Sequence, residues 1–174
     1  MNLPNKLTMG RMLAVPVFIA ALMLGHNYAA TVIFVLAALT DMLDGMIARR
    51  YDLVTNFGKI MDPLADKLLV ISALVCLVEL GVVPGWMVVV VLAREFAVTG
   101  LRTVAAAEGT VIAAGTTGKV KTILQMIAIP ALLLENWPFS LIGFPFAQVM
   151  LWASVVMTVV SGTEYVVRNR EVFR

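Results

Sequence analysis

Cysteine, histidine and charge of either sign are scarce in this chain. Its 174 residues include one cysteine, Cys76, and one histidine, His26. A single cysteine excludes a disulfide framework, and His26 has no partner ligands near it in the sequence, which argues against a metal site there. Charged residues make up 14% of the chain and the formal net charge is +2, so the composition gives no support to nucleic-acid binding.

Most residues of the chain are apolar. They make up 61% of the chain, and the mean hydropathy of +0.95 places the chain among membrane proteins. Six apolar stretches are each close to the roughly 20 residues that cross a bilayer. We expect these spans at residues 12–25, 29–49, 57–80, 84–106, 117–134 and 144–167. The polar stretch before them, residues 1–8, is predicted to be a short interfacial segment.

Lysine and arginine occur in alternate connections between the predicted spans. They lie near both termini, between spans two and three, and around the connection between spans four and five, whereas the other three connections contain none. The positive-inside rule then places both termini and the basic connections on the cytoplasmic side. Because no long insertion or repeat interrupts the pattern, we expect one all-α polytopic membrane domain over residues 1–174.

Four aspartates interrupt the second and third spans: Asp41, Asp44, Asp62 and Asp66. Charges at membrane depth are unfavourable unless they pair, bind metal or line a wet cavity, so four together indicate a function. At about 100° per residue, each pair of aspartates shares one face of its helix. Nearby basic residues are too few to neutralise all four, and an all-carboxylate set favours Mg²⁺ or Mn²⁺. Two such ions holding a phosphate between them are typical of in-line phosphoryl displacement.

A second charged group is mainly basic. Arg94, Glu95 and Arg102 fall in the fourth span, and Lys119 and Lys121 open the fifth. Cations beside the carboxylate site would bind the phosphate of an anionic acceptor substrate. Two alternatives stay open: the lysines only anchor a helix end at lipid headgroups, or the arginine and the glutamate only form an internal ion pair.

The aspartates belong to a longer pattern that resembles the signature of the CDP-alcohol phosphotransferase family. All eight fixed positions of that signature are filled within 26 residues. They read Asp41-x2-Asp44-Gly45-x2-Ala48-Arg49-x8-Gly58-x3-Asp62-x3-Asp66. The resemblance implies a six-helix membrane enzyme that moves a substituted phosphate from a CDP-linked donor to an alcohol and releases CMP.

The same resemblance implies roles for individual residues. A centre of two divalent metal ions would be held by Asp41, Asp44, Asp62 and Asp66, with Asp66 also acting as the general base on the acceptor hydroxyl. The CDP-linked donor would be bound by Asn5, Thr8, Asp41, Gly45, Ala48, Arg49 and Gly58. In this arrangement the cations described above would bind the acceptor phosphate: Arg94, Arg102, Lys119 and Lys121.

Three softer motifs are similar to the phosphatidylglycerophosphate-forming branch of the family. They are residues 2–11, the Arg94-Glu95 pair, and the run GKVKT at residues 118–122. The resemblance implies transfer from CDP-diacylglycerol to sn-glycerol 3-phosphate, by a homodimer among the lipids of a bacterial inner or plasma membrane, with the active site facing the cytoplasm. It extends from residue 2 to about residue 125. Alternatives are another acceptor, such as inositol phosphate or serine, and a small cation- or proton-coupled transporter, for which intramembrane carboxylates are also typical.

Overall fold

The computed structural model of the protein describes residues 3–50, 56–107 and 115–169, and at residues 3–6, 41–50, 56–60, 62, 63, 66 and 107 it describes the backbone alone. Within these ranges the chain forms α-helices and one short 3₁₀ helix, with no strand, so the all-α prediction is confirmed. The elements are α1 (Leu3–Met23), α2 (Asn27–Arg50), α3 (Asn56–Glu79), α4 (Gly85–Ala107), α5 (Thr116–Leu133), η1 (Phe139–Ile142) and α6 (Phe146–Arg168).

The first helix begins earlier than the sequence pattern indicated. α1 starts at Leu3, so most of the segment predicted to be interfacial, residues 1–8, forms the first turns of this helix. Pro4 is compatible with this start because the first N–H groups of a helix have no intrahelical partner. The six α-helices contain 18 to 24 residues, which at 1.5 Å per residue gives lengths of about 27–36 Å.

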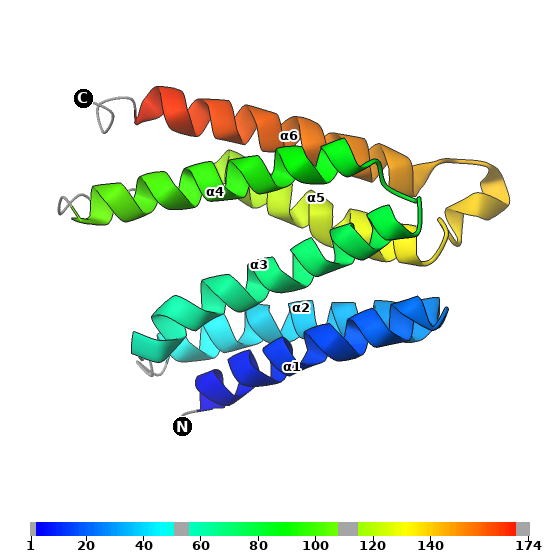
Figure 1. Ribbon diagram of the computed structural model, residues 1–174, viewed down its shortest axis with the longest axis horizontal. Helices are drawn as coiled ribbons and strands as arrows, with labels where there is room; N and C mark the ends of the chain where they lie inside the picture. The colour runs from blue at the N-terminus through cyan, green and yellow to red at the C-terminus, as the bar shows by residue number, and fades with distance from the viewer. Residues whose placement is uncertain (1–2, 51–55, 108–114, 170–174) are drawn as a thin grey trace.

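The helices run up and down in one elongated bundle (Figure 1). α1, α2 and α3 pack together on one side, and α4, α5 and α6 form the other side. Short connections at one end join α1 to α2 and α3 to α4, and the longer connection that contains η1 joins α5 to α6 at the same end. The opposite end, at the left of Figure 1, therefore gathers the starts of α1, α3 and α5 and the ends of α2, α4 and α6.

Apolar side chains fill the space between these helices. Phe18 of α1 and Phe34 of α2 are fully buried, with their ring centroids 6.1 Å apart. The same core includes Leu69 and Leu77 of α3 and Ile129 of α5, each at most 1% exposed. This continuous core joins the two sides of the bundle and fixes where the polar ends of the helices lie.

The outward faces of the bundle are also apolar. Large side chains such as Leu13, Val89 and Phe96 are each more than 60% exposed. Among the described residues, α6 is the one helix that is by itself long and apolar enough to cross a membrane, while Leu7–Met23 and Asn27–Thr40 form shorter apolar segments. An exposed apolar surface of this extent is unusual for a soluble monomer and fits membrane association.

Candidate active site

The four aspartates lie on two helices that are joined by one short connection. Asp41 and Asp44 fall in the last ten residues of α2, and Asp62 and Asp66 fall in the first eleven of α3. Both segments lie at the end of the bundle where α2 ends and α3 begins (Figure 1). The four carboxyl groups themselves lie outside the described residues. Among the side chains that are described, no three of histidine, cysteine, aspartate and glutamate are close enough to share a metal ion.

The residues predicted to bind the CDP-linked donor are spread over the same end of three helices. Thr8 in α1 is fully buried. Asn5 also lies in α1, in the turn before Thr8. The structure describes only the backbone of five of these residues: Asn5, Gly45, Ala48, Arg49 and Gly58. The backbone thus brings the starts of α1 and α3 to the end of α2.

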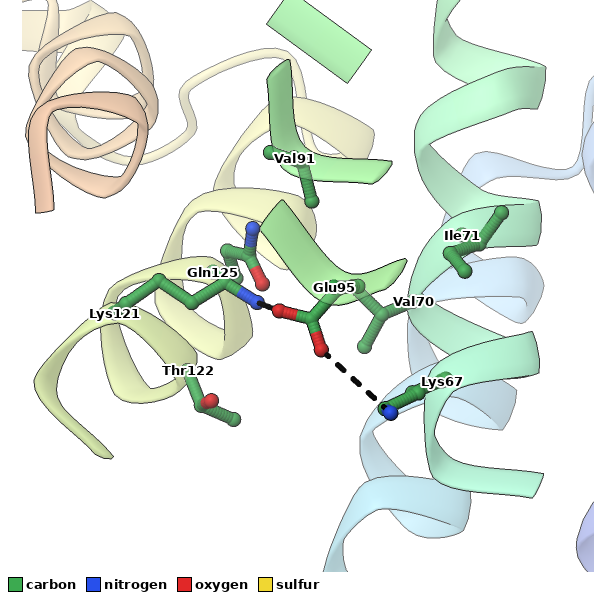
Figure 2. Close-up of a pocket in the computed structure, with 8 residues that line it drawn as sticks. All are labelled: Lys67, Val70, Ile71, Val91, Glu95, Lys121, Thr122 and Gln125. Carbon is green, nitrogen blue, oxygen red and sulfur yellow. Dashed lines mark hydrogen bonds and ion pairs between the residues drawn. The ribbon is translucent and has the colours of Figure 1, made fainter. Parts of the chain in front are cut away.

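Glu95 is the centre of a polar network between α3, α4 and α5. Its Oε1 accepts hydrogen bonds from Arg94 Nη1 at 2.9 Å and from Lys121 Nζ at 2.7 Å, and its Oε2 lies 4.0 Å from Lys67 Nζ. Figure 2 shows Lys67 and Lys121 reaching the carboxylate from opposite sides. The Glu95 side chain is 12% exposed, and three cations surround this largely buried carboxylate.

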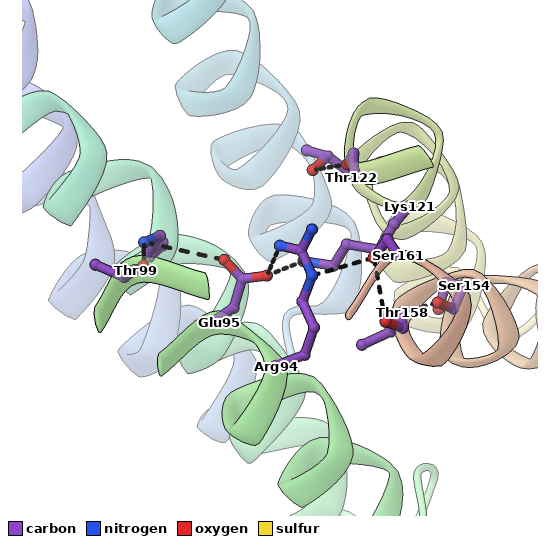
Figure 3. A network of polar contacts seen from close by, with 10 residues as sticks. Arg94, Glu95, Thr99, Lys121, Thr122, Ser154, Thr158 and Ser161 are labelled. Carbon is purple, nitrogen blue, oxygen red and sulfur yellow. Dashed lines mark hydrogen bonds and ion pairs between the residues drawn. The ribbon is translucent and has the colours of Figure 1, made fainter. Parts of the chain in front are cut away.

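Arg94 lies in a slot between α5 and α6 that glycines leave open. Its Nε donates to Ser161 Oγ at 3.1 Å, while Nη1 donates to Glu95 (Figure 3). A Cβ on Gly118 would lie 2.9 Å from Arg94 Nη2, and a Cβ on Gly162 would lie 3.1 Å from Arg94 Cγ. The guanidinium is therefore held by two acceptors and by close packing, which orients it in advance of any ligand.

Next to this slot is a cavity of about 460 Å³ that is strongly basic. Four cationic side chains from three helices line it: Lys67 of α3, Arg94 and Arg102 of α4, and Lys119 of α5. No carboxylate is among the described residues of its lining. Since several cations converge on one space, the cavity has the chemistry to bind an anion that presents several oxygen acceptors, such as a phosphate.

The four residues predicted to bind the acceptor phosphate do not all face this space. Arg94, Arg102 and Lys119 line the 460 Å³ cavity. Lys121 is 5% exposed, pairs with Glu95, and lines a neighbouring cavity of about 30 Å³ together with Gln125 (Figure 2). The structure therefore places Lys121 behind Glu95, where it supports the carboxylate that holds Arg94.

Three residues of the cavity region were not among the sequence-based candidates. Lys67 lines the cavity and lies 2.5 Å from Thr99 Oγ1. Ser161 and Tyr165 reach the region from α6, in a part of the chain where the family motifs gave no guidance. The sequence carried a usable signal, because polar residues recur every three or four positions along that apolar helix, and the structure buries them. They are Ser154, Thr158, Ser161 and Tyr165.

Comparisons with known proteins agree with this chemistry. The family model described as CDP-alcohol phosphatidyltransferase matches residues 1–160. A Bacillus subtilis (strain 168) protein named CDP-diacylglycerol–glycerol-3-phosphate 3-phosphatidyltransferase is 47% identical over 99% of this chain and 97% of its own length. A Rickettsia felis protein of the same name is 39% identical over 94% of this chain and 93% of its own length. A Mycobacterium tuberculosis protein named "Probable phosphatidylglycerophosphate synthase" is 43% identical over 96% of this chain and 81% of its own length.

Proposed function

Because the chain belongs to the CDP-alcohol phosphatidyltransferase family, we propose that it transfers the phosphatidyl group of CDP-diacylglycerol to sn-glycerol 3-phosphate. The products are phosphatidylglycerophosphate and CMP, as in phospholipid biosynthesis. The observation that carries the choice of acceptor is the cavity lined by Lys67, Arg94, Arg102 and Lys119. Four cations suit an acceptor that carries a phosphate better than a neutral alcohol such as serine or glycerol. The relatives named for glycerol 3-phosphate support the same choice.

The family generally uses a divalent metal, and the donor set of this chain fits one. Four carboxylates without histidine or cysteine nearby favour a hard cation such as Mg²⁺ or Mn²⁺, and the end of α2 adjoins the start of α3. The residues that would hold two such ions are Asp41, Asp44, Asp62 and Asp66. When bound, the ions spread the negative charge that the diphosphate develops as CMP leaves.

Side chains of the protein accept the proton and bind the two substrates. The acceptor's hydroxyl oxygen attacks the phosphorus that carries the diacylglycerol, the bond from that phosphorus to CMP breaks, and CMP departs with the bonding electrons. Asp66 takes the proton of the attacking hydroxyl. The donor's cytidine and diphosphate are bound by Asn5, Thr8, Asp41, Gly45, Ala48, Arg49 and Gly58. Arg94, Arg102 and Lys119 hold the acceptor phosphate, and Lys121 acts with them through Glu95.

Six transmembrane helices and cytoplasmic termini complete the proposal. The helices have lengths close to the hydrocarbon thickness of a bilayer, and α1 starts at the same end of the bundle at which α6 finishes. Positive-inside counting assigns that end to the cytoplasm, where glycerol 3-phosphate is dissolved and an inner-leaflet lipid can enter from the side. We assign residues 1–174 to one domain that works as a homodimer in a bacterial inner or plasma membrane.

An activity assay must also distinguish the proposed function from two others. A different acceptor, such as inositol phosphate, would keep the enzyme type and change the product. A cation- or proton-coupled transporter is disfavoured by the family match and by the scarcity of charge toward the end of the bundle that holds η1.

The direct experiment uses the purified protein in detergent with CDP-diacylglycerol, sn-glycerol 3-phosphate and Mg²⁺. We expect CMP and phosphatidylglycerophosphate in equal amounts, and we expect EDTA to stop the reaction and excess Mg²⁺ to restore it. Release of CMP without a phosphatidyl product, or full activity in EDTA, would overturn the proposal.

A further inference from the structure

Tyr165 reaches the basic cavity from α6 and is rigidly placed there. The residue is 7% exposed, and its ring packs with Val98 and Leu101 of α4 in a small apolar cluster. It lies one helical turn beyond Ser161, which binds Arg94, and it lines the same cavity as Arg94, Arg102 and Lys119. Because α4 holds the ring, the Tyr165 side chain is largely fixed at the edge of the cavity that it lines.

The Tyr165 hydroxyl is buried and has no hydrogen-bond partner among the described residues. Buried hydroxyl groups are nearly always hydrogen-bonded, because an unsatisfied one destabilises the fold. A phenylalanine would make the same ring contacts without that penalty. Among the described residues the hydroxyl therefore has no structural partner, and the adjoining cavity is the place where a ligand would supply one.

We propose that Tyr165 is a specificity-determining residue that donates a hydrogen bond to the phosphate monoester of the acceptor. The inference rests on the proposed function and extends it to the last helix. The polar groups that the cationic side chains present to the cavity are all donors, so a ligand there must supply acceptor oxygens. A phenolic O–H adds a directional, uncharged donor to those cations, and a phosphate with oxygens free on several sides can accept from it while it also binds the cations.

The test is the variant Tyr165→Phe, which removes one oxygen and keeps the ring. We expect the KM for sn-glycerol 3-phosphate to rise about tenfold, since a hydrogen bond to a charged group is lost. We expect kcat and the KM for CDP-diacylglycerol to stay within about twofold of the parent, and the melting temperature to stay the same or to rise. The matched control is Tyr28→Phe, because Tyr28 is 72% exposed at the start of α2 and should leave every value unchanged.

A second measurement keeps the inference testable apart from turnover. Inorganic phosphate should raise the melting temperature of the parent protein, and Tyr165→Phe should reduce that shift while Tyr28→Phe does not. An unchanged KM for glycerol 3-phosphate together with an unchanged phosphate shift would overturn the inference. So would an equal rise in KM for both substrates with a lower melting temperature, because that result indicates a structural role. A different result would show that the proposed function is wrong: the parent protein would bind phosphate but would not transfer the phosphatidyl group to glycerol 3-phosphate.

Discussion

Two polar regions of the helical bundle handle charge in opposite ways. At the end of α2 and the start of α3, the sequence supplies four aspartates and neither histidine nor cysteine, a set that in our proposal is neutralised by divalent cations from outside the chain. Between α3, α4 and α5, Glu95 is surrounded by Arg94, Lys121 and Lys67, so that region carries its own counter-ion. It still presents an excess of positive charge to the neighbouring cavity.

The difference suggests a division of work between the two regions. In our proposal the carboxylate region carries out the displacement at phosphorus, whereas the basic region recognises the acceptor. Variants of the first should therefore lower kcat, and variants of the second should raise the KM for the acceptor alone. The variants of each region test whether the fall in kcat and the rise in the acceptor KM can be separated.

The largest effect is expected for Asp62→Asn. Loss of a metal ligand should lower kcat by more than about 100-fold, because even groups behind the ligands contribute about 10–100-fold. The control is Glu79→Gln, which neutralises an exposed acid at the far end of the same helix and should leave turnover unchanged. If Asp62→Asn turns over about as fast as the control, Asp62 does not hold a metal ion that the reaction needs.

Asp66→Asn should have a similar effect on turnover for a different reason. The amide keeps the shape of the side chain but cannot accept the proton of the attacking hydroxyl, so kcat should again fall by about 100-fold or more. Binding of CDP-diacylglycerol should persist, measured by calorimetry or by protection from thermal unfolding. If donor binding is lost together with turnover, Asp66 is mainly a metal ligand.

Glu95→Gln should affect both recognition and stability. The variant leaves Lys121 buried without its full counter-ion and loosens Arg94, so the free energy of unfolding should fall by about 1–3 kcal/mol. The KM for glycerol 3-phosphate should rise about tenfold, while kcat at saturating acceptor should change little. A large fall in kcat with an unchanged acceptor KM would place Glu95 with the carboxylate region instead.

Lys119→Gln and Arg102→Gln should have smaller effects, because both side chains are exposed and their charges are partly screened by water. Each should raise the KM for glycerol 3-phosphate by about 3- to 10-fold and leave the KM for CDP-diacylglycerol within about twofold. Arg168→Gln removes an exposed cation at the same end of the bundle, outside the lining of the cavity, and serves as the control. Equal changes for both substrates would point to anchoring at lipid headgroups.

The smallest effect is expected for Gly118→Ala. The new Cβ would lie 2.9 Å from Arg94 Nη2, at the far end of a long side chain, so the helix can tolerate it if the guanidinium shifts from its two acceptors. We expect a rise of about threefold in the acceptor KM, with stability unchanged or improved because alanine is favoured over glycine in a helix. Gly100→Ala is the matched control, since a Cβ there meets nothing within 4 Å. An acceptor KM that is the same in both variants would mean that the position of Arg94 does not matter.

One of these regions identified the family from the sequence, whereas the layout of the other could not be predicted. The aspartates and their glycines fall within 26 consecutive residues, so their spacing alone identified the family. The basic cavity combines residues far apart in the chain, from Lys67 on α3 to Tyr165 on α6. Lys67 directly follows Asp66 and gave no sign of its own role. The position of Lys121 behind Glu95 depends on how α5 is rotated against α4, and that rotation is set by packing in the core.

Competition among acceptors tests the central claim most directly. Purified protein is given CDP-diacylglycerol, Mg²⁺ and equal concentrations of sn-glycerol 3-phosphate, glycerol, inositol phosphate and serine, and the phosphatidyl products are separated by mass. Our account predicts phosphatidylglycerophosphate as the dominant product, with the preference over glycerol reduced in Lys119→Gln. A parent protein that transfers equally well to glycerol or serine, or mainly to inositol phosphate, would contradict it.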